Sequence, residues 1–174
     1  LQEPIAAMTH PLSRRAANPS RGDKTMKIRN HRLLRDDGQA APYIASPHAG
    51  GTITPRFLIV HYTGGSSAAG TISWFRDPKS KVSAHLVIAR DGTVTQMVPF
   101  DREAWHAGQS RWGSYSGLNR HSIGIELDNA GILIRSGGKW VSKASRKAYP
   151  DSVVTVAPHK NEPPGTAPSG WHAY

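Results

Sequence analysis

A short apolar run from Phe57 to Tyr62 ends abruptly at Thr63-Gly64-Gly65. A run of this length beside glycines predicts a buried strand that leads into a sharp turn. The rest of the chain is also divided into short segments, because 17 glycines and 13 prolines punctuate its 174 residues. We therefore expect short strands joined by long loops. The sequence contains no stretch of about eighteen apolar residues, so we expect no transmembrane segment.

The patterns after this run predict an α/β fold. Ser66-Ser67 can cap a helix that ends at Asp77-Pro78, and this connection is long enough for a crossover between parallel strands. Asp91-Gly92 predicts a two-residue hairpin turn, because this pair accepts the positive φ angles that such turns need. Strands are expected at residues 56–62, 82–90, 93–98 and 122–128. The fold class we predict is a mixed β-sheet flanked by helices.

The two ends of the chain and one internal segment carry weaker patterns. Residues 1–25 are polar, contain three prolines and predict a disordered or peripheral arm. Met26 opens the predicted domain, residues 26–174, and is a candidate for the functional start. Residues 99–121 predict a long loop rich in Trp, His, Gly and Ser. After residue 133 the pattern decays into polar sequence rich in glycine and proline.

Charge and cysteine content limit the partners and cofactors. The formal net charge is +10, and the flanks hold the excess. Residues 1–35 carry eight Lys or Arg against two acids and residues 134–174 carry six against two, whereas residues 56–133 carry eight against six. A protein that binds nucleic acid would place its cations on the folded platform and interleave them with aromatic residues. Since the excess cations here lie on the flanks, we expect no nucleic-acid partner. Since the chain has no cysteine, any metal must be held by His, Asp or Glu.

Two residues on predicted strands are candidates for catalysis or metal binding. His61 lies at the end of its strand, where two glycines clear space for a metal ligand or a catalytic base. Position alone favours the alternative, a histidine bonded to a backbone carbonyl. Glu126 alternates with the apolar residues Ile123, Ile125 and Leu127, so it lies on the opposite face of its strand. There it could deprotonate a water molecule, or it could belong to an ordinary solvated face.

The predicted loop contains a third candidate, the pair Trp105-His106 between small residues. An indole stacks on sugar rings and an imidazole donates hydrogen bonds, so the pair suits sugar or peptide binding. The alternative is a tryptophan that folds the loop back onto the core. His85 could line the same cavity or only pack.

Taken together and in order, these segments resemble the zinc-dependent N-acetylmuramoyl-L-alanine amidases of type 2. That family shares its fold with peptidoglycan recognition proteins and phage amidase lysozymes. The resemblance covers about residues 56–130. The segments that carry it are Ile59-Val60-His61-Tyr62-Thr63, Val82-Ser83-Ala84-His85-Leu86-Val87-Ile88 with Asp91-Gly92, Ala104-Trp105-His106-Ala107-Gly108, and Asn119 with Ser122-Ile123-Gly124-Ile125-Glu126-Leu127.

The resemblance implies hydrolysis of the amide between N-acetylmuramic acid and L-alanine, in peptidoglycan or muropeptides. It implies Zn²⁺ as the cofactor, with His61 as a ligand and Glu126 as the carboxylate that handles the attacking water. Trp105, His106 and Asn119 match the wall of the family's substrate groove. The partner is then a peptidoglycan or muropeptide substrate, and we expect a monomer. The family includes members of several compartments, so the resemblance leaves the location of this chain open.

One part of the family pattern is missing from this sequence. The family completes its zinc site near the C-terminus with a second His and an Asp or Cys, preceded by a Lys, and the sequence contains no such segment. We therefore expect an amidase domain incomplete at its C-terminus, with impaired or absent zinc binding. The alternative is a site rebuilt from other histidines, for which His85, His106, His121, His159 and His172 are available.

Two other functions remain open at this point. The first is a non-catalytic peptidoglycan-binding module of the same fold, against which the presence of Glu126 argues. The second is a basic domain that binds an anionic polymer, against which the distribution of charge argues. Steep weakening of binding by salt would identify the second.

Overall fold

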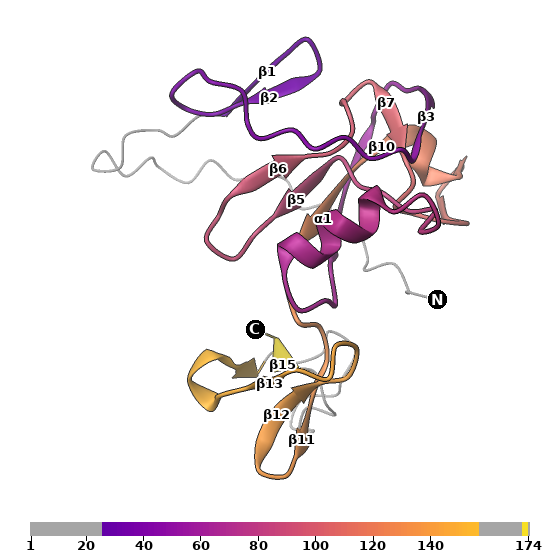
Figure 1. Cartoon of the computed structure of the whole chain (residues 1–174). Helices are drawn as coiled ribbons and strands as arrows, with labels where there is room; N and C mark the ends of the chain where they lie inside the picture. The colour runs from indigo at the N-terminus through magenta and orange to yellow at the C-terminus, as the bar shows by residue number, and fades with distance from the viewer. Residues whose placement is uncertain (1–25, 157–171, 174) are drawn as a thin grey trace, which may run out of the picture.

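A four-stranded mixed sheet forms the centre of the protein (Figure 1). The structure is a computed structural model that describes residues 26–156 and 172–173. The strands follow the order β4 (Phe57–Tyr62), β10 (Ser122–Leu127), β5 (Leu86–Ile88) and β6 (Val94–Gln96). The first three are parallel and β6 is antiparallel to β5. The mixed sheet is confirmed, as is the crossover between parallel strands. The predicted arm, residues 1–25, lies outside the described residues, so the domain limits remain a prediction.

One α-helix, α1 (Ala68–Arg76), lies within the described residues, where the sequence predicted helices in the plural. It begins as predicted, because the Ser67 hydroxyl accepts a hydrogen bond from the Gly70 amide at 3.1 Å. It ends at Arg76, where Asp77 turns to an extended conformation before a proline. Within the same part of the chain, no helix has the length and apolar character needed to cross a membrane.

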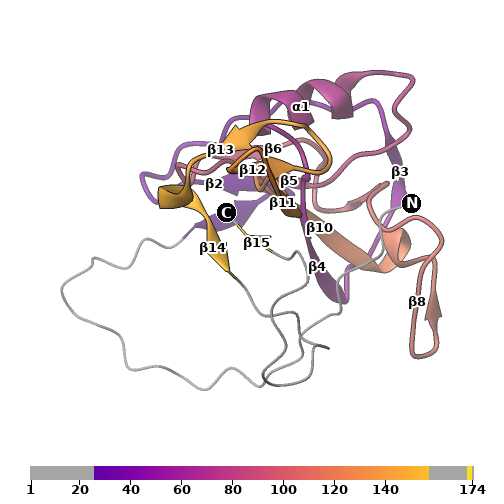
Figure 2. The same ribbon diagram turned by 90° about the horizontal axis from the view of Figure 1, so that it is seen from below.

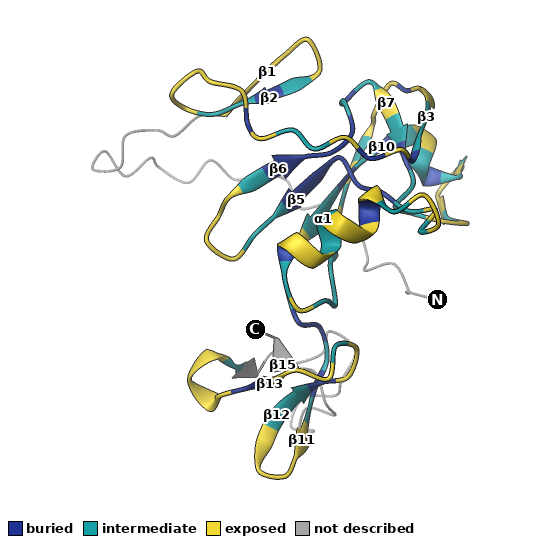
Figure 3. Ribbon diagram, in the orientation of Figure 1, coloured by how far each residue is buried: buried dark blue, intermediate teal, exposed yellow. Residues whose placement is uncertain are grey.

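Two clusters of buried residues pack on the central sheet, one on each face. Figure 3 shows β5 and β6 coloured largely as buried. On one face, Phe75 of α1 packs with Val87 and Met97. On the other face, Leu86 packs with Phe100 and with Leu33 from the hairpin of β1 (Lys27–Arg29) and β2 (Arg32–Leu34). Strand β5 is therefore buried on both sides, as expected of a strand inside a mostly parallel sheet.

The hairpin of β5 and β6 is confirmed, but its turn differs from the prediction. The turn contains Arg90, Asp91 and Gly92, and Ala89 accepts a hydrogen bond from the Gly92 amide at 2.9 Å. Only Gly92 has a positive φ, of 85°. Asp91 instead accepts a hydrogen bond from the Thr93 amide at 2.8 Å through its side chain. The Asp-Gly pair thus forms a three-residue turn in which the aspartate caps and the glycine supplies the left-handed residue.

Residues 99–121 contain more regular structure than the loop we predicted. Strand β7 (Arg102–Ala104) pairs with β3 (Ala49–Thr52). Strands β8 (Arg111–Trp112) and β9 (Tyr115–Ser116) form a short hairpin, and Figure 2 shows β8 projecting away from the sheet. A 3₁₀-helix, η1 (Leu118–His121), leads directly into β10. These elements were missed because each is too short to show periodicity.

The prediction of patternless sequence after residue 133 is wrong. Strands β11 (Leu133–Ser136), β12 (Lys139–Ser142) and β13 (Ala148–Tyr149) form an antiparallel sheet, which lies beyond one end of α1 in Figure 1. Its hairpin turn is Gly137-Gly138, with both φ angles positive. Buried Ala130, Leu133 and Tyr149 form its own small core. The chain continues through η2 (Asp151–Val153) and β14 (Thr155–Val156), which pairs with β15 (His172–Ala173).

Candidate active site

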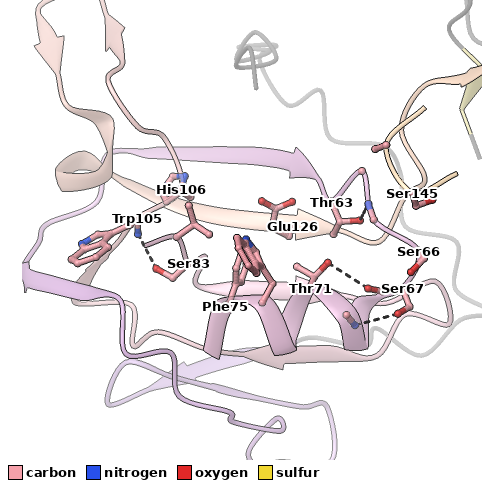
Figure 4. Close-up of a pocket in the computed structure, with 16 residues that line it drawn as sticks. Thr63, Ser66, Ser67, Thr71, Phe75, Ser83, Trp105, His106, Glu126 and Ser145 are labelled. Atoms are coloured by element: carbon pink, nitrogen blue, oxygen red, sulfur yellow. Dashed lines mark hydrogen bonds between the residues drawn. The ribbon is translucent and has the colours of Figure 1, made fainter. Parts of the chain in front are cut away.

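A groove opens at the carboxyl end of strand β4, between α1, strand β10 and the β12–β13 turn. This is where ligands bind in open α/β sheets. Its cavity measures about 460 Å³. We call it the Glu126 groove, and its lining residues are Thr63, Gly64, Gly65, Ser66, Ser67, Gly70, Thr71, Trp74, Phe75, Val82, Ser83, Trp105, His106, Glu126, Ala144 and Ser145. Figure 4 shows Trp105, Ser83 and His106 toward one end, Glu126 in the middle, and Ser66, Ser67 and Ser145 toward the other.

Glu126 lies on the face of the sheet that α1 covers. Its register partners are His61 on β4 and Val87 on β5, and Val87 packs against the helix. Within the described residues, the Oε2 atom of Glu126 is buried and has no hydrogen-bond partner. Burial raises the pKa of this carboxyl from 4.5 to about 7. Glu126 can therefore accept or release a proton near neutral pH, as a general base or acid must.

His61 reaches the site through a chain of hydrogen bonds. Its Nε2 atom lies 3.0 Å from Nδ1 of His106. The Nε2 atom of His106 lies 3.2 Å from the Ser122 hydroxyl, which donates its proton to the Leu118 carbonyl at 2.6 Å. Burial lowers the pKa of His61, and burial together with the charges of His61 and His85 lowers that of His106 to about 3. Both rings are therefore neutral at pH 7.

This chain assigns the tautomers of both histidines. The Ser122 hydroxyl has one proton and gives it to Leu118, so it accepts a hydrogen bond from Nε2–H of His106. The Nδ1 atom of His106 is then an acceptor, and Nε2–H of His61 is the donor. This leaves the Nδ1 lone pair of His61 available to a proton or a metal ion.

The backbone around His106 is shaped to hold this ring. Gly124 lies beneath it, and a Cβ atom at that position would come within 2.5 Å of His106 Cδ2. The Asn119 side-chain oxygen accepts hydrogen bonds from the amides of His106 at 3.1 Å and Ala107 at 2.7 Å. Asn119 thus fixes the loop that presents His106, and it is not among the residues that line the groove.

Trp105 is also anchored from behind. Its amide donates to the Ser83 hydroxyl at 2.8 Å, and Ser83 in turn donates to the His48 carbonyl at 2.6 Å. The His48 ring lies 5.3 Å from the Trp105 ring and is itself bonded to the Asp77 carbonyl at 2.8 Å. Trp105 is therefore held at its end of the groove, with an aromatic neighbour.

The predicted site residues fall into three groups in the structure. Glu126, Trp105 and His106 line the groove, whereas His61 and Asn119 do not line it and are hydrogen-bonded to His106. His85, for which the sequence left a cavity position or core packing open, is fully buried in the core. Its ring accepts a hydrogen bond from the Gly124 amide at 3.0 Å and contacts the Arg102 carbonyl at 2.8 Å.

Sequence reasoning missed Trp74 and the pair Ala144-Ser145, all of which line the groove. Trp74 is 53% exposed, which is unusual for a tryptophan on a short helix. The sequence does contain a signal for the exposure of Trp74. Ala68, Ile72 and Phe75 recur at helical spacing and form the buried face of the helix, and Trp74 falls outside that face. No comparable signal marks Ala144-Ser145, because only the tertiary fold brings the β12–β13 turn to the groove.

The residues present do not form a complete metal site. Within residues 26–156, no group of three or more His, Asp or Glu side chains is arranged to hold a metal ion. A catalytic zinc needs about three protein ligands and a water molecule. His61 Nδ1 is a donor that the hydrogen-bond pattern leaves available to such an ion.

Comparison with known proteins places these features in a family. The sequence profile of the N-acetylmuramoyl-L-alanine amidases matches residues 51–161. The 1,6-anhydro-N-acetylmuramyl-L-alanine amidase AmpD of Escherichia coli (strain K12) is 38% identical over 98 residues, which cover 50% of this chain and 54% of that protein. AmpD of Haemophilus influenzae (strain ATCC 51907 / DSM 11121 / KW20 / Rd) is 34% identical over 154 residues, 70% of this chain and 84% of that protein.

A solved AmpD derivative aligns over 51% of this chain and 60% of its own, with 33% identity and a TM-score of 0.40. The chain spans about half the length of the first curated relatives that it matches. The profile match covers well over half of the chain and includes the whole Glu126 groove. The chain therefore belongs to the type 2 N-acetylmuramoyl-L-alanine amidase family.

Proposed function

We propose that this chain hydrolyses the amide bond between N-acetylmuramic acid and L-alanine in peptidoglycan or muropeptides. The observation that carries the proposal is the position of Glu126, a half-buried residue midway along the groove whose Oε2 atom is buried and has no hydrogen-bond partner among the described residues. A purely structural carboxylate would be paired, because an unpaired buried acceptor destabilises the fold. A carboxylate left unpaired inside a groove is suited to a water molecule or substrate.

Glu126 acts as the proton carrier in the reaction that we propose. Its carboxylate takes a proton from a water molecule as the water oxygen bonds to the amide carbon. The carbon–nitrogen bond then breaks, and Glu126 returns the proton to the leaving amino group of L-alanine. The products are a lactyl carboxylate on the sugar and a peptide with a free amino terminus. A pKa of about 7 lets one group perform both transfers near neutral pH.

Zinc dependence is part of the proposal, with His61 as the ligand that this chain contributes through Nδ1. The described residues supply too few ligands to hold the ion alone, so no catalytic step is derived through it. Elemental analysis after dialysis tests this point, with His61→Ala as the comparison. Zinc that is bound by the wild type and lost in His61→Ala supports the assignment of His61. Bound zinc that is equal in both proteins contradicts it, whereas negligible zinc in both proteins is the result expected of an incomplete ligand set.

Product analysis tests the reaction itself. A muropeptide is incubated with the protein, and mass spectrometry follows the two expected fragments. Glu126→Gln should form both fragments at least about a hundredfold more slowly. Glu103→Gln, which changes a carboxylate outside the groove lining, should act like the wild type. Cleavage at another bond, or cleavage by Glu126→Gln at the wild-type rate, would refute the proposal.

A second candidate is a module that binds peptidoglycan without cleaving it. The observation that favours it is the lack of a three-ligand metal site among residues 26–156. Equal affinity of wild type and Glu126→Gln for a muropeptide, with no product from either, would select this candidate.

A further inference from the structure

We propose that the turn from Ser142 to Lys147 is a subsite that recognises a carboxylate of the peptide attached to L-alanine. The inference rests on the proposed function, because it assigns one end of the Glu126 groove to that peptide. The turn connects β12 to β13, in the segment that the sequence patterns did not predict to be ordered.

The turn is held firmly against the groove. Ala144 and Ser145 line the cavity, and Ala144 Cβ lies 4.0 Å from the position that a Cβ atom on Gly64 would occupy. The buried Ser142 hydroxyl donates to the Ala130 carbonyl at 2.9 Å and accepts from the Ser145 amide at 3.1 Å. The Arg146 amide donates to the Ser142 carbonyl at 2.9 Å. The turn is therefore a defined backbone structure beside the groove, and the residues that flank Ala144-Ser145 belong to it.

Those flanking side chains are cations without carboxylate partners. Lys143, Arg146 and Lys147 are exposed on either side of Ala144-Ser145. The sequence contains no Asp or Glu between Asp128 and Asp151. Asp128 pairs with Arg90 at 3.6 Å, and Asp151 pairs with Arg135 at 2.7 Å. Within the described residues, Lys143 and Arg146 form no ion pair, so they are available to an anionic ligand.

The backbone of Arg146 gives a second reason to assign a function to this turn. Arg146 has a φ of 61°, in the left-handed region that a residue with a Cβ atom adopts at an energetic cost. Glycine or asparagine would fit this position with less strain. Such conformations concentrate at sites of function, where the side chain is needed more than the local stability.

The two ends of the groove also differ in chemistry. Figure 4 places Trp105 at one end, Ser145 at the other and Glu126 between them. If the scissile amide lies at Glu126, its sugar and its peptide extend toward opposite ends. The indole of Trp105 suits the sugar, because aromatic rings stack on sugar faces. The cations beside Ser145 suit the peptide, which carries at least its terminal carboxylate.

Binding of two matched ligands tests the subsite without any need for turnover. The ligands are an N-acetylmuramoyl-L-alanyl peptide with a free terminal carboxylate and the same peptide as its terminal amide. Their Kd values are measured by calorimetry at low salt, since screening weakens exposed ion pairs. Every protein compared, the otherwise wild-type reference included, carries Glu126→Gln so that neither ligand is cleaved. The wild type should bind the free acid about threefold to tenfold more tightly, as expected for two partly exposed ion pairs.

The double variant Lys143→Gln with Arg146→Asn should lose this preference and bind the amide as the wild type does. Asparagine accepts the left-handed conformation, so the turn is kept while the charge is removed. Lys139→Gln is the control, because Lys139 is an exposed cation at the opposite end of β12. Unchanged thermal unfolding of all variants checks that the fold is intact.

The subsite alone would be overturned if the wild type showed no preference, if the preference survived in the double variant, or if Lys139→Gln caused an equal loss. Equal weakening of both ligands by the double variant would also overturn it, since that indicates general attraction to an anionic polymer. Failure of the wild type to bind either ligand would instead refute the proposed function, and the subsite with it.

Discussion

The Nε2 atom of His61 lies 3.0 Å from Nδ1 of His106, although 45 residues separate them in the sequence. His106 in turn bonds to Ser122 at 3.2 Å. The consequence is that two neutral rings are held in fixed tautomers beside Glu126, with His61 Nδ1 left available. The candidate site is therefore organised by hydrogen bonds between strand β4, strand β10 and the loop after β7.

Acid should weaken the fold through His106. Its pKa is lowered to about 3, whereas the unfolded chain takes up this proton near pH 6.5. The unfolded state binds more protons between these values, so stability falls as pH falls from about 6.5 to about 3, by at most about 5 kcal/mol. His106→Gln should reduce the loss of unfolding free energy between pH 7 and pH 4, measured by urea denaturation. An unchanged loss in His106→Gln would contradict the assignment.

Glu126→Gln should stabilise the protein at alkaline pH. The folded-state pKa is raised to about 7 from 4.5, so the folded state binds more protons between these values and loses stability as pH rises through them. Removing the charge should raise the unfolding free energy at pH 8 by at most about 3 kcal/mol, and by much less at pH 4. Thermal unfolding at both pH values measures the difference. A destabilised variant at pH 8 would show that Glu126 stabilises the fold instead.

Asn119→Ala should destabilise the protein by about 1–3 kcal/mol, because it removes the acceptor shared by the His106 and Ala107 amides. Asn119→Asp keeps an acceptor at the same position and should recover most of the loss. Denaturant unfolding of the two variants tests this role. Equal stability of Asn119→Ala and the wild type would mean that water replaces the side chain.

Trp74→Ala should weaken muropeptide binding with little effect on stability. The side chain is 53% exposed and lines the groove, so its truncation removes ligand contact and little core packing. Trp112, which is 45% exposed on β8 and is not a groove residue, provides the matched control as Trp112→Ala. We expect at least a fivefold higher Kd for Trp74→Ala alone, about 1 kcal/mol of lost contact. Equal Kd values for the two variants would assign Trp74 no role in binding.

Local patterns predicted the centre of the fold because each acts within a few residues. The apolar run before Thr63, the cap at Ser67 and the alternation along β10 all have counterparts in the structure. The sheet of β11, β12 and β13 was missed although Gly137-Gly138 is a hairpin signal. Its strands are short and partly exposed, so their alternation is weak.

The candidate site was predictable in its residue types and less so in its geometry. Glu126 and His61 are register partners on neighbouring parallel strands, which no local pattern reveals. Burial raises the pKa of Glu126, and the groove around it is lined in part by α1 and the β12–β13 turn, which meet β10 only in the folded chain. For His85 the sequence left two alternatives open, a place in the cavity wall or a place in the core. The structure shows the second, because His85 is fully buried and does not line the groove.

The rate of muropeptide hydrolysis as a function of pH tests the central claim most directly. With Glu126 as the base, the rate should rise with pH and reach half its maximum near pH 7, where this carboxyl loses its proton. Glu126→Gln should lower kcat by about 10²–10⁴-fold and leave the Kd for the muropeptide within twofold. A variant that cleaves at the wild-type rate, or a wild-type rate that falls as pH rises through 7, would contradict the assignment of Glu126 as the base.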